Sequence, residues 1–204
     1  MKEDILSKSD QFIGKVNSIL QEFHFVNSQT LLQLINTYAT AFYGSSVWNL
    51  RSKECEKLFT TWNVTVRKAL NLDRRTHRHL IVPLSECLHL KSVLMSRFIR
   101  FYQQSLINSP KFTVRFLARL LEHDKRSVFG QNLSAIARVC GKADCQNVTP
   151  NEVKKSVSYA SPPAECSWIA GLASELLSIR DSKLDVVGFS PEEINEMLTA
   201  VCTS

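Results

Sequence analysis

The chain has 204 residues, of which 44% are hydrophobic and 22% are charged, and its formal net charge is +6. This balance excludes a disordered tail, and the length allows one domain or two small ones with a buried core. No apolar run approaches the roughly 18 residues that a membrane-spanning helix needs, and the polar start MKEDILSKSD does not fit a signal peptide. We therefore expect an intracellular protein, nuclear or cytoplasmic, without membrane partners.

The first seventy residues have apolar side chains at helical spacing. A first helix carries Ile5 and Phe12 on its apolar face. A second begins after Ser28, its predicted N-cap, and Gly44 offers a stop; its buried stripe is expected to include Tyr38. A third helix covers about 52–70.

The middle of the chain begins with a break in this periodicity. Asn71, Asp73 and Pro83 predict an ordered loop or short turns over 71–83. A long helix should follow over 84–107, with Leu88 as its first apolar position. Ser109 and Pro110 are then expected as N-cap and first residue of a helix that runs to about 121.

The rest of the chain has three further helix starts with capping residues. Ser127 should cap a helix that ends near Cys140 and stops at Gly141. Thr149 to Glu152 and Ser190 to Glu193 both have the pattern of a capping box with proline at the first helical position. Another helix should follow Pro162-Pro163.

The pattern contains no convincing strand, so we predict an all-α, multi-helix bundle of about seven to nine helices. The stretch 141–163 is polar and predicts a linker with a short helix. The expected organisation is a helical domain over 1–140, the linker 141–163, and a C-terminal helical region over 164–204.

The positive charge is concentrated in one segment. Residues 67–126 hold 13 basic and 4 acidic side chains, a net charge of +9, whereas residues 142–204 hold 5 basic and 9 acidic side chains, a net charge of −4. The middle segment is therefore the candidate surface for a polyanion.

Sequence motifs for catalysis are missing. The chain has no Gly-rich phosphate loop, no His-Glu-x-x-His, no Cys-x-x-Cys and no Gly-x-Ser-x-Gly. The six cysteines are spread without a tight framework, which favours reduced thiols over disulfides. A zinc site built from Cys140, Cys145, Cys166 and His123 is a weaker alternative, because no second Cys/His pair stands at a regular distance. We expect neither a metal nor a cofactor.

Two features of the basic segment can be interpreted in more than one way. His77 and His79 flank Arg78, which favours a surface that donates hydrogen bonds to phosphate, with a structural loop as the alternative. Aromatic residues are interleaved with the cations, a mixture that suits a nucleic-acid groove. They can equally be core side chains beside a solvated charged face.

Three stretches show a family resemblance when taken in order. They are LLQLINTYATAFYGSSVWNL, LFTTWNVTVRKALNLDRRTHRHLI and LHLKSVLMSRFIRFYQQSLINSP. Together they resemble the region after the polymerase palm in reverse transcriptases of non-LTR retrotransposons. The matching residues are Tyr43, Gly44, Trp48, Trp62, Asn63, Arg67, His77, Arg97, Phe98 and Phe101. The C-terminal stretch from Glu175 is also similar to the end of the second reading frame of jockey-like elements.

The resemblance implies a thumb-like helical domain that lies against template-primer nucleic acid. It does not imply polymerase activity, because the palm aspartates that hold two metal ions include an adjacent Asp-Asp pair and this sequence has none. The expected contacts with RNA, DNA or an RNA–DNA hybrid come from nine residues: Arg67, Lys68, Arg74, Arg75, His77, Arg78, His79, Arg97 and Arg100. Tyr43, Gly44, Trp48 and Trp62 are assigned to packing and turn geometry.

The first hypothesis is thus a non-catalytic fragment of a reverse-transcriptase-like protein that binds nucleic acid through a basic helical face. The alternative is a helical protein-interaction module, for example one that docks on a reverse-transcriptase palm, or a relic of a mobile element without nucleic-acid binding. An exposed apolar patch on the first two helices would favour the protein-interaction module.

Overall fold

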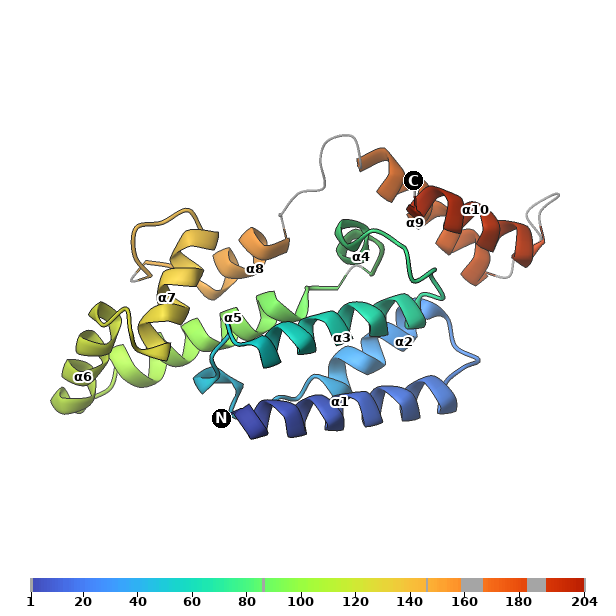
Figure 1. The fold of residues 1–204 in the computed structure, drawn as a ribbon. Coiled ribbons are helices and arrows are strands. Elements are labelled where there is room, and N and C mark those ends of the chain that lie inside the picture. Colours follow the sequence, from blue (N-terminus) through green and yellow to red (C-terminus); the bar gives the residue numbers. More distant parts are fainter. Residues whose placement is uncertain (1, 86, 146, 159–166, 183–189, 204) are drawn as a thin grey trace. The chain divides into compact units, whose positions relative to one another are not determined.

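The computed structural model describes residues 2–85, 87–145, 147–158, 167–182 and 190–203 (Figure 1). Within these residues the chain forms ten α-helices and no β-strand, which confirms the all-α prediction and exceeds the seven to nine helices expected. The helices are α1 Lys2–Glu22, α2 Ser28–Leu34, α3 Lys53–Ala69, α4 Arg78–Ser85, α5 Leu90–Phe101, α6 Phe112–His123, α7 Val128–Val139, α8 Pro150–Ser158, α9 Ser167–Ser182 and α10 Pro191–Thr203. Two π-helical segments, η1 Ile35–Ala39 and η3 Tyr102–Ile107, extend α2 and α5, and η2 Ser45–Val47 is a 3₁₀ turn.

The helices group into two compact units that alternate along the chain. Unit 1 comprises residues 1–6, 42–59 and 88–160, and unit 2 comprises residues 7–41, 60–87 and 161–204. Helices α1 and α3 contribute residues to both units. The domain boundaries expected from the sequence, at 140 and 163, stay a prediction.

Unit 1 is organised around α5, which contacts α8, η2 and η3. Its buried face holds Leu94, Phe98 and Ile99, each at most 1% exposed. Serine hydroxyls on α5 also attach α8, because Ser92 Oγ donates to Lys154 O at 3.2 Å and Ser96 Oγ donates to Pro150 O at 3.2 Å. The short helix expected within 141–163 is therefore folded against α5.

Unit 2 packs α9 against both α10 and α4. The buried residues of these helices recur at intervals of three and four, and they include Leu80, Ile81, Leu84, Ala173, Leu176, Leu177, Ile194 and Leu198. Burying one apolar stripe on each helix stabilises the unit by roughly 25 cal/mol for each Å² of apolar surface removed from water.

The predicted capping boxes are confirmed. In α8, Glu152 N donates to Thr149 Oγ1 at 3.1 Å, and Thr149 N donates to Glu152 Oε2 at 2.7 Å. Ser190 and Glu193 repeat this exchange at α10, at 3.2 and 2.7 Å. Ser127 caps α7 by accepting from Gly130 N at 2.9 Å. These local bonds satisfy N–H groups that a helix start otherwise leaves unpaired, which is why they can be recognised in the sequence.

The sequence predicted a loop over 71–83 and one long helix over 84–107. The loop is shorter than predicted, and the long helix begins later. Residues 78–85 form α4, which contains Pro83, and the next helix begins only at Leu90 with His89 as N-cap. Packing of Leu80, Ile81 and Leu84 stabilises α4 enough to offset the hydrogen bond that proline removes. Leu88, expected on the apolar face, lies before α5 and is 38% exposed.

Three smaller corrections concern helix ends and one side chain. The N-cap of α2 is Asn27, whose Oδ1 accepts from Thr30 N at 2.8 Å, and Ser28 is the first helical residue. Helix α6 begins at Phe112, so Pro110 precedes it. Tyr38 is 62% exposed, because the chain is π-helical over 35–39 and the widened turn shifts the register of the buried stripe. The helix expected after Pro162-Pro163 is α9, which begins at Ser167, whereas the two prolines lie outside the described residues.

Candidate nucleic-acid interface

The C-terminal end of α3 is closed by Asn71 in the left-handed conformation, with φ at 48°. Leu72 N donates to Arg67 O at 2.8 Å, and Asn71 N donates to Lys68 O at 3.1 Å. This is the hydrogen-bond pattern of a Schellman motif, for which asparagine is a common substitute for glycine. The chain therefore turns sharply after α3 and enters the basic loop with a defined direction.

Arg67 holds the far end of this loop. Its Nε and Nη2 donate to Thr76 O at 3.2 and 2.8 Å. The side chain is half-buried, and this burial lowers the pKa of the guanidinium from its ordinary value of 12.5. Arg67 thus has a structural role in the loop, beside the phosphate contact predicted from the sequence.

Two further bonds order the loop. Asp73 Oδ1 accepts from Arg75 N at 2.7 Å, a local turn that aspartate favours. His77 N donates to Cys202 O at 3.1 Å, which attaches the loop to the C-terminal end of α10 within unit 2. The loop of residues 71–77 is therefore ordered, as the sequence predicted.

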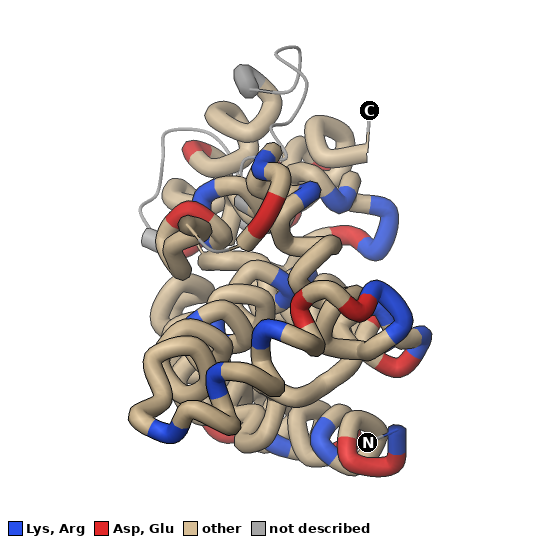
Figure 2. The backbone as a smooth tube through the Cα atoms, turned by 90° about the vertical axis from the view of Figure 1, so that its left-hand side faces the viewer, with Lys and Arg blue, Asp and Glu red and all other residues tan. Residues whose placement is uncertain are grey.

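Lys68, Arg74, Arg75 and Arg78, named here the loop cation cluster, all have exposed side chains. None of them lies within 4.0 Å of a carboxylate in the part of the chain that the structure describes. The backbone positions of Lys and Arg are blue in Figure 2. Arg74 and Arg75 lie on the fixed loop, and Lys68 and Arg78 lie on the helix ends that adjoin it. Four exposed cations on such a segment have the electrostatics of a phosphate-binding surface.

The two histidines lie beside this cluster. Their rings stack, with 5.3 Å between the centroids of His77 and His79 and an interplanar angle of 21°. His77 is exposed and His79 is half-buried, so the pair presents one ring to solvent. The stack suits a polar surface that donates a hydrogen bond.

Arg97 and Arg100 lie on α5 in unit 1, whereas the other seven residues of the predicted interface lie in unit 2. Arg100 is exposed, and Arg97 is half-buried with its pKa lowered by that burial. Residues 67–79 are thus a continuous segment of unit 2, and the part of the predicted interface on α5 belongs to unit 1. A single face that runs from Arg67 to Arg100 stays a prediction.

The four residues assigned to packing and turns behave differently from one another. Trp48 and Trp62 are 0% and 1% exposed, and Trp48 Nε1 donates to Asp4 Oδ2 at 2.7 Å. Gly44 has φ at 80°, a conformation that glycine adopts without strain. Tyr43, in contrast, is 91% exposed, so the assignment of its ring to packing is wrong. Phe42, the residue before Tyr43, is 4% exposed instead.

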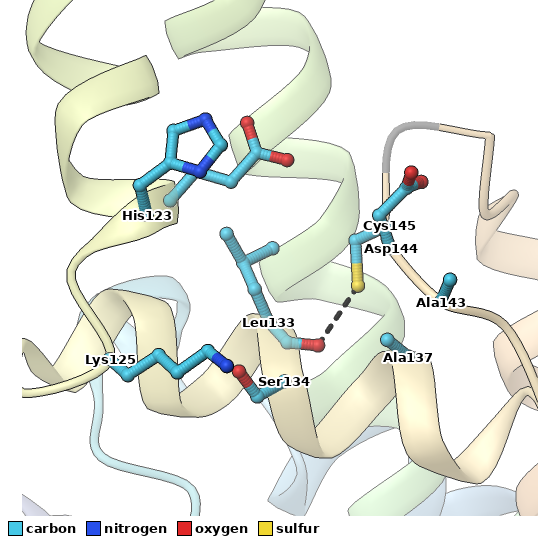
Figure 3. A pocket seen from close by; sticks show the side chains of 9 residues that line it. His123, Lys125, Leu133, Ser134, Ala137, Ala143, Asp144 and Cys145 are labelled. Carbon is cyan, nitrogen blue, oxygen red and sulfur yellow. Dashed lines mark hydrogen bonds between the residues drawn. The ribbon is translucent and has the colours of Figure 1, made fainter.

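Two of the residues named for a zinc site, His123 and Cys145, line a pocket of about 230 Å³ in unit 1 (Figure 3). The thiol of Cys145 donates to Leu133 O at 2.9 Å, and burial raises its pKa to about 12. Zinc binds the thiolate, which this environment disfavours. Within the described residues no group of three His, Cys, Asp or Glu side chains could hold a metal ion, and Cys166 lies outside them.

Two polar residues that organise the units have no obvious sequence signal. Asn132 is 0% exposed on α7 in unit 1, and Arg180 on α9 has a side chain that is 10% exposed in unit 2. Arg180 Nη2 donates to Leu70 O at 2.7 Å, directly before the basic loop. From the sequence alone, Arg180 cannot be distinguished from a surface cation. Only its hydrogen-bond partners reveal its role.

The chain matches no protein-family model, no curated protein and no solved structure. Among the described helices, none combines the length and the apolar character that crossing a membrane requires.

Proposed function

We propose that this chain is a non-catalytic, reverse-transcriptase-like fragment whose unit 2 binds the backbone of template-primer nucleic acid. The observation that carries the proposal is the loop cation cluster. Arg74 and Arg75 lie on a loop held by Arg67 and His77, and Lys68 and Arg78 lie on the adjoining ends of α3 and α4. All four are exposed, and none pairs with a carboxylate of the described residues. Template-primer is proposed as the ligand because of the family resemblance. The proposal includes an intracellular location, nuclear or cytoplasmic.

The ordering of the loop matters for affinity. Four cations on a flexible chain would lose conformational freedom on binding. Two helix ends joined by a loop already held at Thr76 and His77 lose less. Arg78 is also the first residue of α4, and the dipole of a helix favours an anion at this end. Binding of this kind recognises phosphates and should depend little on base sequence.

The proposal is tested by the affinity of the purified chain for an RNA–DNA hybrid over a series of salt concentrations. The informative variant changes all four residues of the loop cation cluster to alanine and keeps Arg67, because removing Arg67 would also release the loop. The slope of log affinity against log salt should fall by roughly 0.9 for each phosphate group that the variant no longer neutralises.

A charge-matched control changes Lys15, Arg51, Lys53 and Lys155, four exposed cations outside the site, to alanine. This control should bind the hybrid like the unmodified chain at every salt concentration. An equal fall in affinity for both four-residue variants would mean that only net charge matters and would refute the proposed site. A well-folded chain with no affinity for the hybrid would refute the function itself.

A further inference from the structure

Helix α6 exposes its apolar face. Phe112, Phe116, Leu117, Leu120 and Leu121 are 70%, 52%, 57%, 52% and 40% exposed, and Ala118 is the buried residue of this helix. The spacing places all five side chains on one side of α6. The rings of Phe112 and Phe116 also stack on each other, with 6.1 Å between their centroids. We name these five residues the α6 face.

Unit 1 holds α6 firmly by its other side. Glu122 Oε2 accepts from Tyr102 Oη at 2.8 Å, which joins α6 to η3. At the end of α6, a Cβ built on Gly130 of α7 would stand 2.3 Å from Asp124 O, so the two backbones approach closely. The α6 face is thus presented on a fixed helix, and exposing this much apolar surface in one place is unusual for a protein without a partner.

Cations flank the α6 face at both ends of the helix. Lys111 precedes the helix, and Lys125 and Arg126 follow it; all three are exposed and none pairs with a carboxylate of the described residues. Of the nearby acids, Glu122 is held by Tyr102 and Arg119, and Asp124 accepts from Arg126 N at 2.9 Å. The rim of the face is therefore positive at both ends.

We propose that the α6 face docks an amphipathic helix of a partner protein that carries acidic side chains beside its apolar stripe. The apolar side chains supply the buried core of such an interface, and the cationic rim selects the acidic partner.

A second copy of this chain is a poorer occupant, because pairing two α6 faces would bring cations together. Leucine side chains do not stack on bases, so three of the five residues give single-stranded nucleic acid little to bind. The surface lies outside the loop cation cluster and does not depend on the proposed function.

The test uses two synthetic amphipathic helical peptides with the same leucine stripe, one flanked by glutamate and the other by lysine. The full chain should bind the glutamate peptide about tenfold or more tightly than the lysine peptide. A Phe116→Ser, Leu120→Ser variant should lose this binding. The control Phe25→Ser, Leu172→Ser replaces the same exposed residue types elsewhere and should retain it.

A charge-reversed variant makes the test specific to the rim. With Lys111→Glu, Lys125→Glu and Arg126→Glu, the preference should change to the lysine peptide. Each of the following results would overturn the proposal: no binding of the glutamate peptide, equal binding of both peptides, or dimerisation of the chain that the Phe116→Ser, Leu120→Ser variant abolishes. Binding of anionic phospholipid vesicles or single-stranded RNA through the α6 face, in place of the peptide, would overturn it in favour of that other partner.

Discussion

Asn132 and Trp48 are joined by a buried hydrogen bond, in which Asn132 Nδ2 donates to Trp48 O at 2.7 Å. The other end of the same amide, Oδ1, accepts from Leu50 N at 3.1 Å. One side chain of α7 therefore satisfies backbone groups on both sides of Asn49. These groups belong to the segment that follows η2, which has no regular secondary structure. This bridge fixes the backbone around the buried indole of Trp48.

Asn132→Ala should destabilise unit 1. The substitution leaves a buried carbonyl at Trp48 and a buried N–H at Leu50 without partners, which costs about 2–4 kcal/mol in the free energy of unfolding. Urea unfolding followed by far-ultraviolet circular dichroism measures the change. Ser134→Ala, at an exposed position of the same helix, should shift the midpoint little, and equal midpoints for both variants would contradict the role of the bridge.

Arg180→Ala should destabilise unit 2 by about 2–4 kcal/mol, because the substitution removes several charge-assisted hydrogen bonds at once. Arg180 donates to Leu70 O at 2.7 Å, Asn195 Oδ1 at 3.2 Å and Ser28 Oγ at 3.3 Å. The bond to Leu70 lies directly before the basic loop, so affinity for an RNA–DNA hybrid should fall as well. Arg138→Ala removes an exposed cation and is the control. Unchanged thermal unfolding of Arg180→Ala would contradict the assigned role.

Glu152 should make stability depend on pH at the acidic end. Its bonds to Lys142 and to the cap residue Thr149 lower the pKa of the carboxyl from its ordinary value of 4.5 to about 2. A depressed folded-state pKa gives stability that is present above pH 4.5 and is lost as the pH falls toward 2. Glu152→Gln should flatten the dependence of the thermal midpoint on pH within this window. Glu175→Gln, at an exposed site on α9, should leave it unchanged, and parallel curves for Glu152→Gln and the unmodified chain would contradict the prediction.

Two glycine substitutions should have opposite signs. Gly130→Ala places a methyl group 2.3 Å from Asp124 O, which forces α6 and α7 apart and costs about 1–3 kcal/mol. Gly14→Ala adds a methyl group in open space within α1, where the higher helix propensity of alanine should stabilise by about 0.5–1 kcal/mol. Thermal unfolding of the two variants checks the signs. A neutral Gly130→Ala would show that the α6–α7 approach is not tight.

The helices with strong local signals are those that the sequence located well. The capping boxes at Thr149 and Ser190 and the left-handed stop at Gly141 involve residues within a few positions of one another, so the chain encodes them without tertiary help. The apolar periodicity of α3 also identified its buried face, including Trp62. The caps and the helix stop depend on contacts between residues close in the sequence, and the buried face of α3 depends on burial of one side of the helix.

The errors arose where packing overruled local preference. Pro83 predicts a helix break, yet the burial of Leu80 and Leu84 keeps α4 helical through it. Tyr38 matched an apolar stripe of period 3.6, but the π-helical turn changed that period and exposed the ring. Neither outcome can be worked out from neighbours in the sequence alone.

The candidate site divides in the same way. The concentration of thirteen cations in residues 67–126 is a property of the sequence, as is the absence of an Asp-Asp pair. Only the tertiary structure distinguishes Arg67, which holds the loop at Thr76, from Lys68, which is exposed on the next position of α3. It alone also determines that Phe116 and Leu120 are exposed on α6 while Phe98 and Tyr102 are buried, although both pairs are apolar and stand four residues apart. Spacing defines the faces of a helix, but which face is buried depends on the long-range packing of the other helices.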